Sequence, residues 1–173
     1  GCERGHTVMR CCFCIKDTAT TGICTLSRHD VVRCGAGNGD SVVTASDLAG
    51  YQAVNSGAGN ITLQPIDPNS TIGLGGGNGT FNLGDNDLVS LASSGSVIIG
   101  RTSDGNGGVD IDAVDLSGES FDLTVVGGSI AVTGLDNSNN DITLDARNGS
   151  ITDGEAGTNT DITSLALAMT ATG

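Results

Sequence analysis

Aspartate is the residue type in this chain whose spacing could support cation binding. Asp122, Asp141 and Asp161 lie 19 and 20 residues apart, and each is followed by Leu or Ile and then by Thr. Carboxylate oxygens are ligands that Ca²⁺ prefers in proteins. If one interval corresponds to one coil of a repeating fold, the three carboxylates form a column. The column predicts either a calcium site or a set of turns in which each aspartate accepts backbone N–H bonds.

A second acidic pair, Asp110 and Asp112, follows a glycine-rich stretch. Residues 105–112 read Gly-Asn-Gly-Gly-Val-Asp-Ile-Asp, which is similar to the calcium-binding nonapeptide repeat of other solenoids but is not repeated nine residues later. We therefore add Asp110 and Asp112 to the predicted calcium ligands. With Arg101 they are also the best candidates for a carbohydrate-active β-helix enzyme, because glycoside chemistry needs clustered acids.

Aromatic residues argue against the enzyme. Beyond residue 40 the chain contains only Tyr51, Phe81 and Phe121 as aromatic residues, whereas sugar-binding clefts usually present aromatic rings to the substrate. We expect a protein that is not an enzyme and needs no cofactor, with calcium as the one ion to consider. The carbohydrate-active enzyme and a calcium-binding solenoid module are kept as the alternative functions.

The aspartate spacing belongs to a longer repeat of apolar residues. Leu123, Ile142 and Ile162 directly follow the three aspartates. A second series, with separations of 19, 20, 19 and 21 residues, consists of Ile72, Leu91, Ile111, Ile130 and Ile151. A fixed period near twenty with short β-type segments between Gly, Asn and Asp turns is typical of β-solenoids. We predict an all-β parallel β-helix with about twenty residues per coil, in which each series forms a ladder of core side chains.

Short strands are predicted where apolar and polar residues alternate between turn residues. The predicted strands are Asn60–Leu63, Thr71–Leu74, Thr80–Leu83, Leu88–Leu91, Ser96–Gly100, Val109–Leu116, Phe121–Val126, Ser129–Thr133, Asp141–Ala146, Gly149–Thr152 and Asp161–Leu167. Because side chains alternate across a strand, the isoleucines of the Asp-Ile-Thr motifs should face inward and their Asp and Thr neighbours outward.

Composition and charge fit a narrow solenoid core and exclude two kinds of partner. The 173 residues include 28 Gly, 2 Pro and 2% aromatics, too few aromatics for a thick globular core. The net charge is −13, and residues 41–173 hold two Arg against sixteen acids, or 2 − 16 = −14. Such a surface repels nucleic-acid phosphates. No apolar run reaches the ~18 residues of a membrane helix, so we expect no membrane insertion.

The cysteines define two regions of unlike composition. Residues 1–40 contain all six cysteines and both histidines, and residues 41–173 contain neither. We therefore predict a Cys-rich N-terminal segment at residues 1–40 and the β-helix repeat at residues 41–173. The cysteine spacing fits no common zinc module. Three disulfides, free thiols, a metal site and a misassigned stretch without an evolved role all stay open for this segment.

Several motifs together carry a family resemblance. They are Asn60-Ile61-Thr62-Leu63, Thr71-Ile72-Gly73-Leu74-Gly75-Gly76, Phe81-Asn82-Leu83, Ile98-Ile99-Gly100-Arg101 and the stretch from Asp141 to Ile151. Over about residues 55–165 the chain resembles the filamentous-hemagglutinin-like bacterial adhesins that are exported by two-partner secretion. The resemblance implies a right-handed parallel β-helix in a secreted or cell-surface adhesin or fibre. The expected partners are further copies or neighbouring repeats, and a glycan or protein of a host surface.

Overall fold

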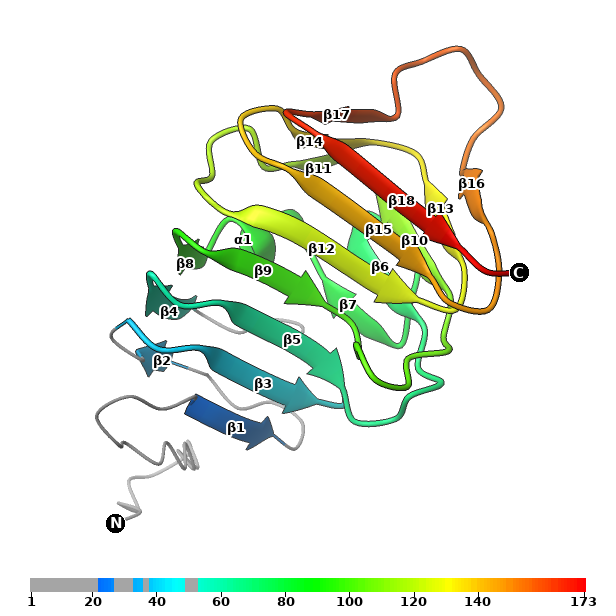
Figure 1. Cartoon of the computed structure of the whole chain (residues 1–173). Helices are drawn as coiled ribbons and strands as arrows, with labels where there is room; N and C mark the ends of the chain where they lie inside the picture. The colour runs from blue at the N-terminus through cyan, green and yellow to red at the C-terminus, as the bar shows by residue number, and fades with distance from the viewer. Residues whose placement is uncertain (1–21, 27–32, 36–37, 49–52) are drawn as a thin grey trace.

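The computed structural model describes residues 22–26, 33–35, 38–48 and 53–173. In these residues the chain winds into right-handed coils that stack along one axis (Figure 1). The strands of every sheet pair in parallel, because each coil lays its strands on those of the coil before it. The predicted parallel β-helix is thereby confirmed.

The longest sheet, here called sheet A, forms one continuous side of the β-helix. Its seven strands in stacking order are β1 (Gly22–Leu26), β3 (Ser41–Ala45), β5 (Ile61–Pro65), β9 (Ser96–Ile99), β12 (Asp122–Gly127), β15 (Ile142–Ala146) and β18 (Leu167–Ala171). The residues paired at its first inward position are Gly22, Ser41, Ile61, Val97, Leu123, Ile142 and Leu167. Differences between these numbers give coils of 19, 20, 36, 26, 19 and 25 residues. The period near twenty thus holds for three coils, and insertions lengthen the others.

Two further sides complete each coil. Sheet C consists of β7 (Phe81–Leu83), β6 (Ile72–Gly75), β10 (Val109–Asp112), β13 (Ile130–Val132) and β16 (Ile151–Asp153). The third side contains sheet B, with β2 (Arg33–Gly35), β4 (Ala53–Gly57) and β8 (Leu91–Ser93), and sheet D, with β11 (Val114–Asp115), β14 (Leu135–Asn137) and β17 (Ile162–Ser164). In the coils that begin with β9, β12 and β15, the chain passes from sheet A to sheet C, then to sheet D, and back to sheet A.

Several predicted strands have different limits in the structure. The predicted strand Leu88–Leu91 is wrong, because α1 (Asp85–Leu88) and a turn precede β8. Val109–Leu116 is two strands, since Ala113 adopts a φ of 53° and turns the chain between sheets C and D. The 36-residue coil is long because it contains both β6 and β7, which pair with each other, as well as α1.

The core is a column of aliphatic side chains enclosed by the three sides. Strands such as β5 and β15 alternate buried and partly exposed residues, as the alternation of side chains in a strand requires. Phe81 and Phe121, two of the three aromatic residues in 41–173, are both buried in this column. The single helix of the described residues has four residues, and no described helix is long and apolar enough to cross a membrane.

The β-helix also includes strands that precede residue 41. β1 pairs with β3, and β2 pairs with β4, so the stack includes residues 22–26 and 33–35. The change in composition at residue 40 therefore does not mark the first strand of the stack. The side chains on which the cysteine predictions depend lie outside the described residues.

Candidate functional site

The predicted aspartate column lies at the corner where each coil enters sheet A. The residues that directly precede its first inward position from β3 onward are Asp40, Asn60, Ser96, Asp122, Asp141 and Ala166. Asp122 and Asp141 are neighbours in this column, as predicted. Asn60, the first residue of the motif Asn60-Ile61-Thr62-Leu63, also lies in this column. Asp40 was not predicted, because Val rather than Thr follows two residues later.

Side chains in this corner column accept hydrogen bonds from the backbone of the next coil. Oδ1 of Asp40 accepts the N–H of Asn60 at 2.7 Å, and Oδ1 of Asn60 accepts the N–H of Ser96 at 2.9 Å. Oδ1 of Asp122 accepts the N–H of Asp141 at 3.0 Å. The amide of Asn60 and the carboxylates of Asp40 and Asp122 thus accept the same hydrogen bond at equivalent corners. The geometry matches the turn-stabilising interpretation of the column.

Asp161 lies in a different part of the coil. The adjacent Ile162 pairs with Leu135 in sheet D, whereas Ile142 pairs with Leu123 on one side and with Leu167 on the other. The prediction that Ile162 continues the ladder of Leu123 and Ile142 is therefore wrong, and so is the prediction that Asp161 stacks on Asp141. The coil from Ile142 to Leu167 has 25 residues. The third motif therefore comes before the chain returns to sheet A, and it lies at the corner before sheet D.

The second apolar series is also divided between columns. Ile130 pairs with Ile151 and, on its other side, with Val109, which pairs with Ile72. Ile111 lies two positions further along the strand and pairs with Val132. Leu91 belongs to sheet B, where it pairs with Val54. Ile72, Ile130 and Ile151 thus share one ladder, and Ile111 and Leu91 belong to others.

Asp110 and Asp112 lie on the outward side of β10 beside the glycine-rich turn at residues 75–79. Oδ2 of Asp110 accepts the backbone N–H of Asn78 at 2.8 Å and its side-chain amide at 3.3 Å. The N–H of Gly76 donates to the backbone oxygen of Asp112 at 2.8 Å. A Cβ on Gly77 would lie 2.1 Å from the backbone oxygen of Asp110, so only glycine fits there. This turn packs directly on β10, and Asp110 holds it.

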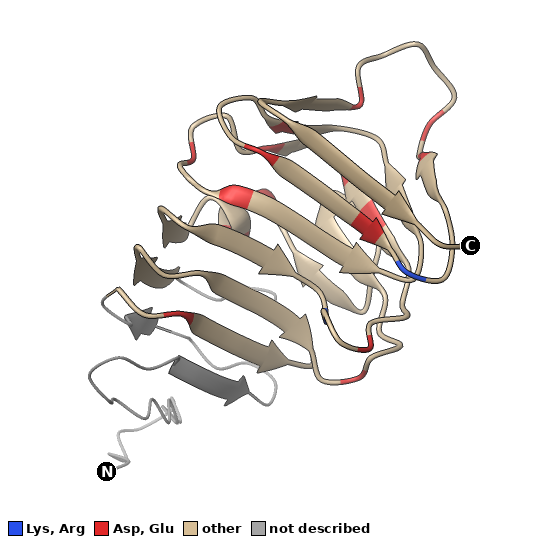
Figure 2. Cartoon of the chain, in the orientation of Figure 1, with Lys and Arg blue, Asp and Glu red and all other residues tan. Residues whose placement is uncertain are grey.

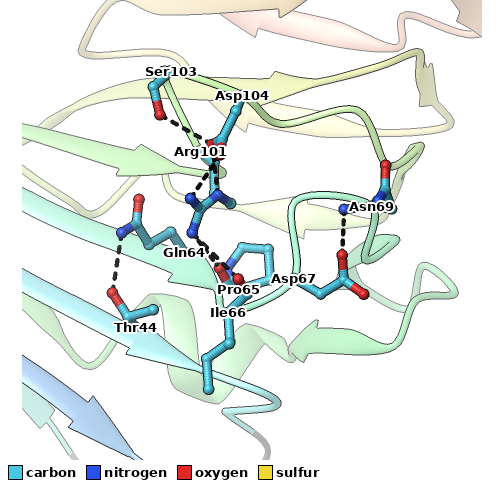
Figure 3. Close-up of polar contacts among 9 residues, drawn as sticks. All are labelled: Thr44, Gln64, Pro65, Ile66, Asp67, Asn69, Arg101, Ser103 and Asp104. Carbon is cyan, nitrogen blue, oxygen red and sulfur yellow. Dashed lines mark hydrogen bonds and ion pairs between the residues drawn. The ribbon is translucent and has the colours of Figure 1, made fainter.

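Arg101 makes its hydrogen bonds with residues other than Asp110 and Asp112 (Figure 3). Its Nε and Nη2 donate to the two carboxylate oxygens of Asp104 at 2.7 and 2.9 Å. Its Nη1 donates to the backbone oxygens of Pro65 at 3.2 Å and Ile66 at 3.4 Å, in the preceding coil. The hydrogen bond with Asp104 raises the pKa of Arg101 and lowers the pKa of Asp104. Arg101 therefore links two coils.

The remaining arginine of residues 41–173 is also paired. Nε of Arg147 lies 3.2 Å from Oδ2 of Asp145, two residues earlier. Asp104 lies in the loop between β9 and β10, and Asp145 lies on β15. The carbohydrate-active enzyme stays an alternative predicted from the sequence.

Four further aspartates stabilise turns within one coil. In each, Oδ1 accepts the backbone N–H of the residue two positions later, at distances of 2.8 to 3.0 Å; the acceptors are Asp67, Asp115, Asp136 and Asp153. This is the geometry of an Asx turn. At Asp115 hydrogen bonds from the side chain and backbone of Ser117 lower the pKa of the carboxyl group. The signal that could have predicted these turns is Asp two residues before Asn, Ser or Glu at the end of a strand.

The predicted calcium ligands do not come together in one place. Asp110 and Asp112 lie on sheet C, Asp122 and Asp141 at the corner before sheet A, and Asp161 directly before sheet D. Within the residues that the structure describes, no three His, Cys, Asp or Glu side chains form a group that could hold a metal ion. Figure 2 shows the acidic residues spread over strand ends and loops. Calcium binding stays a prediction from the sequence.

The corner column allows a direct test of the role of Asp122. Asp122→Ala removes the acceptor for the N–H of Asp141 and is expected to lower the free energy of unfolding by about 1 kcal/mol. Asp122→Asn should have little effect, because Asn60 accepts the same bond in the same column. Both values are obtained from urea denaturation. Equal destabilisation by Asn and Ala would show that the charge, and not the hydrogen bond, is what the corner requires.

These features define a parallel β-helix in which most of the acidic side chains serve the architecture of turns and corners. Comparisons with protein-family models, curated proteins and solved structures find no match.

Proposed function

We propose that this chain is a structural repeat segment of a secreted or cell-surface bacterial adhesin or fibre, and that its role is mechanical. The observation that carries the proposal is the unbroken parallel sheet A, which passes through seven stacked strands. Six steps of ~4.8 Å between parallel strands give a rod about 29 Å long. A rod of this kind extends in proportion to the number of coils and can hold a binding site away from a cell surface.

The chemistry of the side chains supports a structural role. Two of the five acids predicted as ligands, Asp110 and Asp122, accept backbone hydrogen bonds with their carboxylates. Arg101 and Arg147 are each paired with an aspartate nearby in the sequence. The resemblance to filamentous-hemagglutinin-like adhesins supports the secreted or cell-surface location. A host-surface glycan or protein is the expected external partner.

Removal of one whole coil tests whether the segment is a modular rod. Deletion of residues 123–141 takes out β12, β13 and β14, and it lets β15 follow Asp122 and pair with β9. We expect this variant to stay folded, with the circular dichroism of the parent chain and a maximum dimension shorter by about 5 Å in X-ray scattering. Deletion of residues 123–131 removes half a coil and should unfold the neighbouring coils, because residues 132–141 alone are too short to pass through all three sides between Asp122 and Ile142.

Attachment and hydrolysis assays separate the proposed role from the enzyme. Beads coated with the chain are expected to attach to host cells or to a glycan array. Otherwise, a binding domain fused to the chain is expected to attach to them when the chain presents it on the beads. Release of reducing ends from a glycan panel, lost in Asp112→Ala, would contradict the proposed function. An unfolded product from the whole-coil deletion would contradict the modular rod.

A further inference from the structure

Three Asn-Gly pairs lie in the part of the β-helix described at residues 53–173. They are Asn78-Gly79, Asn106-Gly107 and Asn148-Gly149, and all three asparagines are exposed. In such a pair the backbone nitrogen of the glycine can attack the side-chain carbonyl carbon of the asparagine. Glycine permits this attack more readily than other residues, because it has no Cβ and adopts backbone conformations that other residues avoid. Since exposure is common to the three pairs, their backbone restraints decide which one reacts.

The pair Asn106-Gly107 is held by the coils on both sides of it. The N–H groups of Asn106 and Gly107 donate to the backbone oxygen of Pro68 at 2.8 and 3.3 Å. The backbone oxygen of Gly107 accepts the N–H of Gly128 at 2.7 Å. A Cβ on Gly107 would overlap the backbone oxygen of Ser70, so the backbone has little room to rotate. Attack by the nitrogen of Gly107 therefore requires the loss of its hydrogen bond and a movement of the corner.

The pair Asn78-Gly79 is held by a charged acceptor and by strand β6. Oδ2 of Asp110 accepts both the backbone N–H and the side-chain amide of Asn78, at 2.8 and 3.3 Å. The side chain is thereby fixed beside its own backbone nitrogen. A Cβ on Gly79 would overlap the backbone nitrogen of Gly73, and the backbone oxygen of Gly79 accepts the side-chain amide of Asn82 at 2.7 Å. Ring closure at this pair requires Asn78 to leave Asp110 first.

The pair Asn148-Gly149 has fewer restraints. Within the described residues the N–H of Gly149 donates to no acceptor. A Cβ on Gly149 would lie 3.0 Å from the backbone oxygen of Gly128 and from Cβ of Ser129, so its neighbours leave more space than those of Gly79 and Gly107. The side chain of Asn148 makes one hydrogen bond, from its amide nitrogen to Oδ1 of Asn106, which is a neutral acceptor. The attacking nitrogen and the glycine backbone are both freer here.

We propose that Asn148 is the site of a spontaneous covalent modification, in which the asparagine loses ammonia and becomes aspartate or isoaspartate. The nitrogen of Gly149 forms a bond to Cγ of Asn148 and gives up its proton, while the Cγ–Nδ2 bond breaks and Nδ2 leaves with that proton as ammonia. Water then opens the cyclic imide. Attack of water at Cγ gives aspartate, and attack at the main-chain carbonyl carbon gives isoaspartate, in which the backbone runs through Cγ. Water is the only co-reactant.

The modification removes a link between two coils that are not adjacent. Asn148 donates to Asn106 across the coil that contains Gly127 and Gly128, whose lack of side chains lets the two amides meet. A carboxylate at position 148 has no hydrogen to donate to Asn106, and it adds a negative charge to a region that already carries −14. Isoaspartate also lengthens the backbone at a corner where the N–H of Asn148 donates to Gly128 at 3.0 Å. We expect this corner to open more readily after modification.

Storage of the purified chain in mildly alkaline buffer, followed by proteolysis and mass spectrometry of the peptides, tests this site. We expect NH2 to be replaced by OH at Asn148 at least about tenfold faster than at Asn78 or Asn106, because the other two pairs must open before the ring can close. In urea, where the chain is unfolded, the three rates should become similar, since a glycine follows each asparagine. Methylation by an isoaspartyl methyltransferase identifies the isoaspartate product.

Gly149→Ala is the matched variant, and Gly118→Ala is its control. A Cβ on residue 149 hinders the approach of the nitrogen and should slow the reaction at Asn148 by at least about tenfold, with the other two sites unchanged. Circular dichroism shows whether each variant folds as the parent chain does. Equal rates at the three sites of the folded chain, or an Asn148 that reacts only in urea, would overturn the proposal. So would a Gly149→Ala variant that folds and reacts as fast as the parent chain.

Discussion

Ile142→Asp is expected to lower the free energy of unfolding by about 4 kcal/mol or more. Ile142 is 1% exposed and lies between Leu123 and Leu167 in the first inward column of sheet A. Substitution removes a buried aliphatic side chain and places a carboxylate where the described core offers aliphatic neighbours. Both changes act in the same direction, and the second adds the cost of burying a charge without a partner.

The damage should be confined to neighbouring coils. In a linear stack each coil contacts mainly the coils before and after it. Amide hydrogen exchange should therefore increase in β12, β15 and β18, while β3 and β5 keep most of their protection. Urea denaturation provides the overall loss, and exchange measured by mass spectrometry provides its location.

Thr143→Ser is the matched control because Thr143 is the next residue along β15 and faces outward. Its side chain is partly exposed and its strand neighbour is Thr124. Loss of one methyl group from this position should change the free energy of unfolding by less than about 0.5 kcal/mol. Similar destabilisation by the two substitutions would show that the inward and outward assignment of β15 is wrong.

The sequence period was sufficient to predict the class of fold. The core ladder from Leu123 to Ile142 and the one from Ile130 to Ile151 are both present, because these coils contain 19 and 21 residues and no large insertion. The period also placed Asp122 beside Asp141 at one corner. Near-equal coil length is what allows residues far apart in sequence to be assigned to one column.

The period failed where coils carry insertions. The motif Asp-Ile-Thr specifies a turn residue, an inward residue and an outward residue, and any side of a coil can use that pattern. At residues 141–143 the motif begins a strand of sheet A, and at residues 161–163 it begins a strand of sheet D. Sequence spacing alone could not distinguish these sides, because the loop between β16 and β17 adds length without changing the motif.

The predicted ligands illustrate a second limit. A carboxylate that binds calcium and a carboxylate that accepts a backbone N–H bond occur in the same Gly- and Asn-rich surroundings. Asp110 could be distinguished only by its contact with Asn78, which is 32 residues away in sequence. The glycine-rich turn at residues 75–79 and Asp110 belong to one structural unit, although neither motif indicates the other in the sequence.

Gly100→Ala is expected to be the most destabilising conservative substitution at a coil corner, with a loss of about 3 kcal/mol or more. Gly100 has a φ of +105°, which residues with a Cβ rarely adopt. A Cβ added to Gly100 would lie 2.1 Å from the backbone oxygen of Val126 in the next coil. Its N–H donates to the backbone oxygen of Leu63 in the preceding coil at 2.9 Å. To accept a methyl group the corner would have to move away from β12 while it is held to β5.

Gly118→Ala is the matched control, because nothing lies within 4 Å of a Cβ built on Gly118. It should leave stability within about 0.5 kcal/mol of the parent chain, or raise it slightly by restricting the unfolded state. Thermal and urea unfolding of the two variants give the comparison directly. A tolerated Gly100→Ala would mean that β9 and β12 can separate at little cost. Since sheet A passes through both strands, that result would also count against the stiffness on which the proposed mechanical role depends.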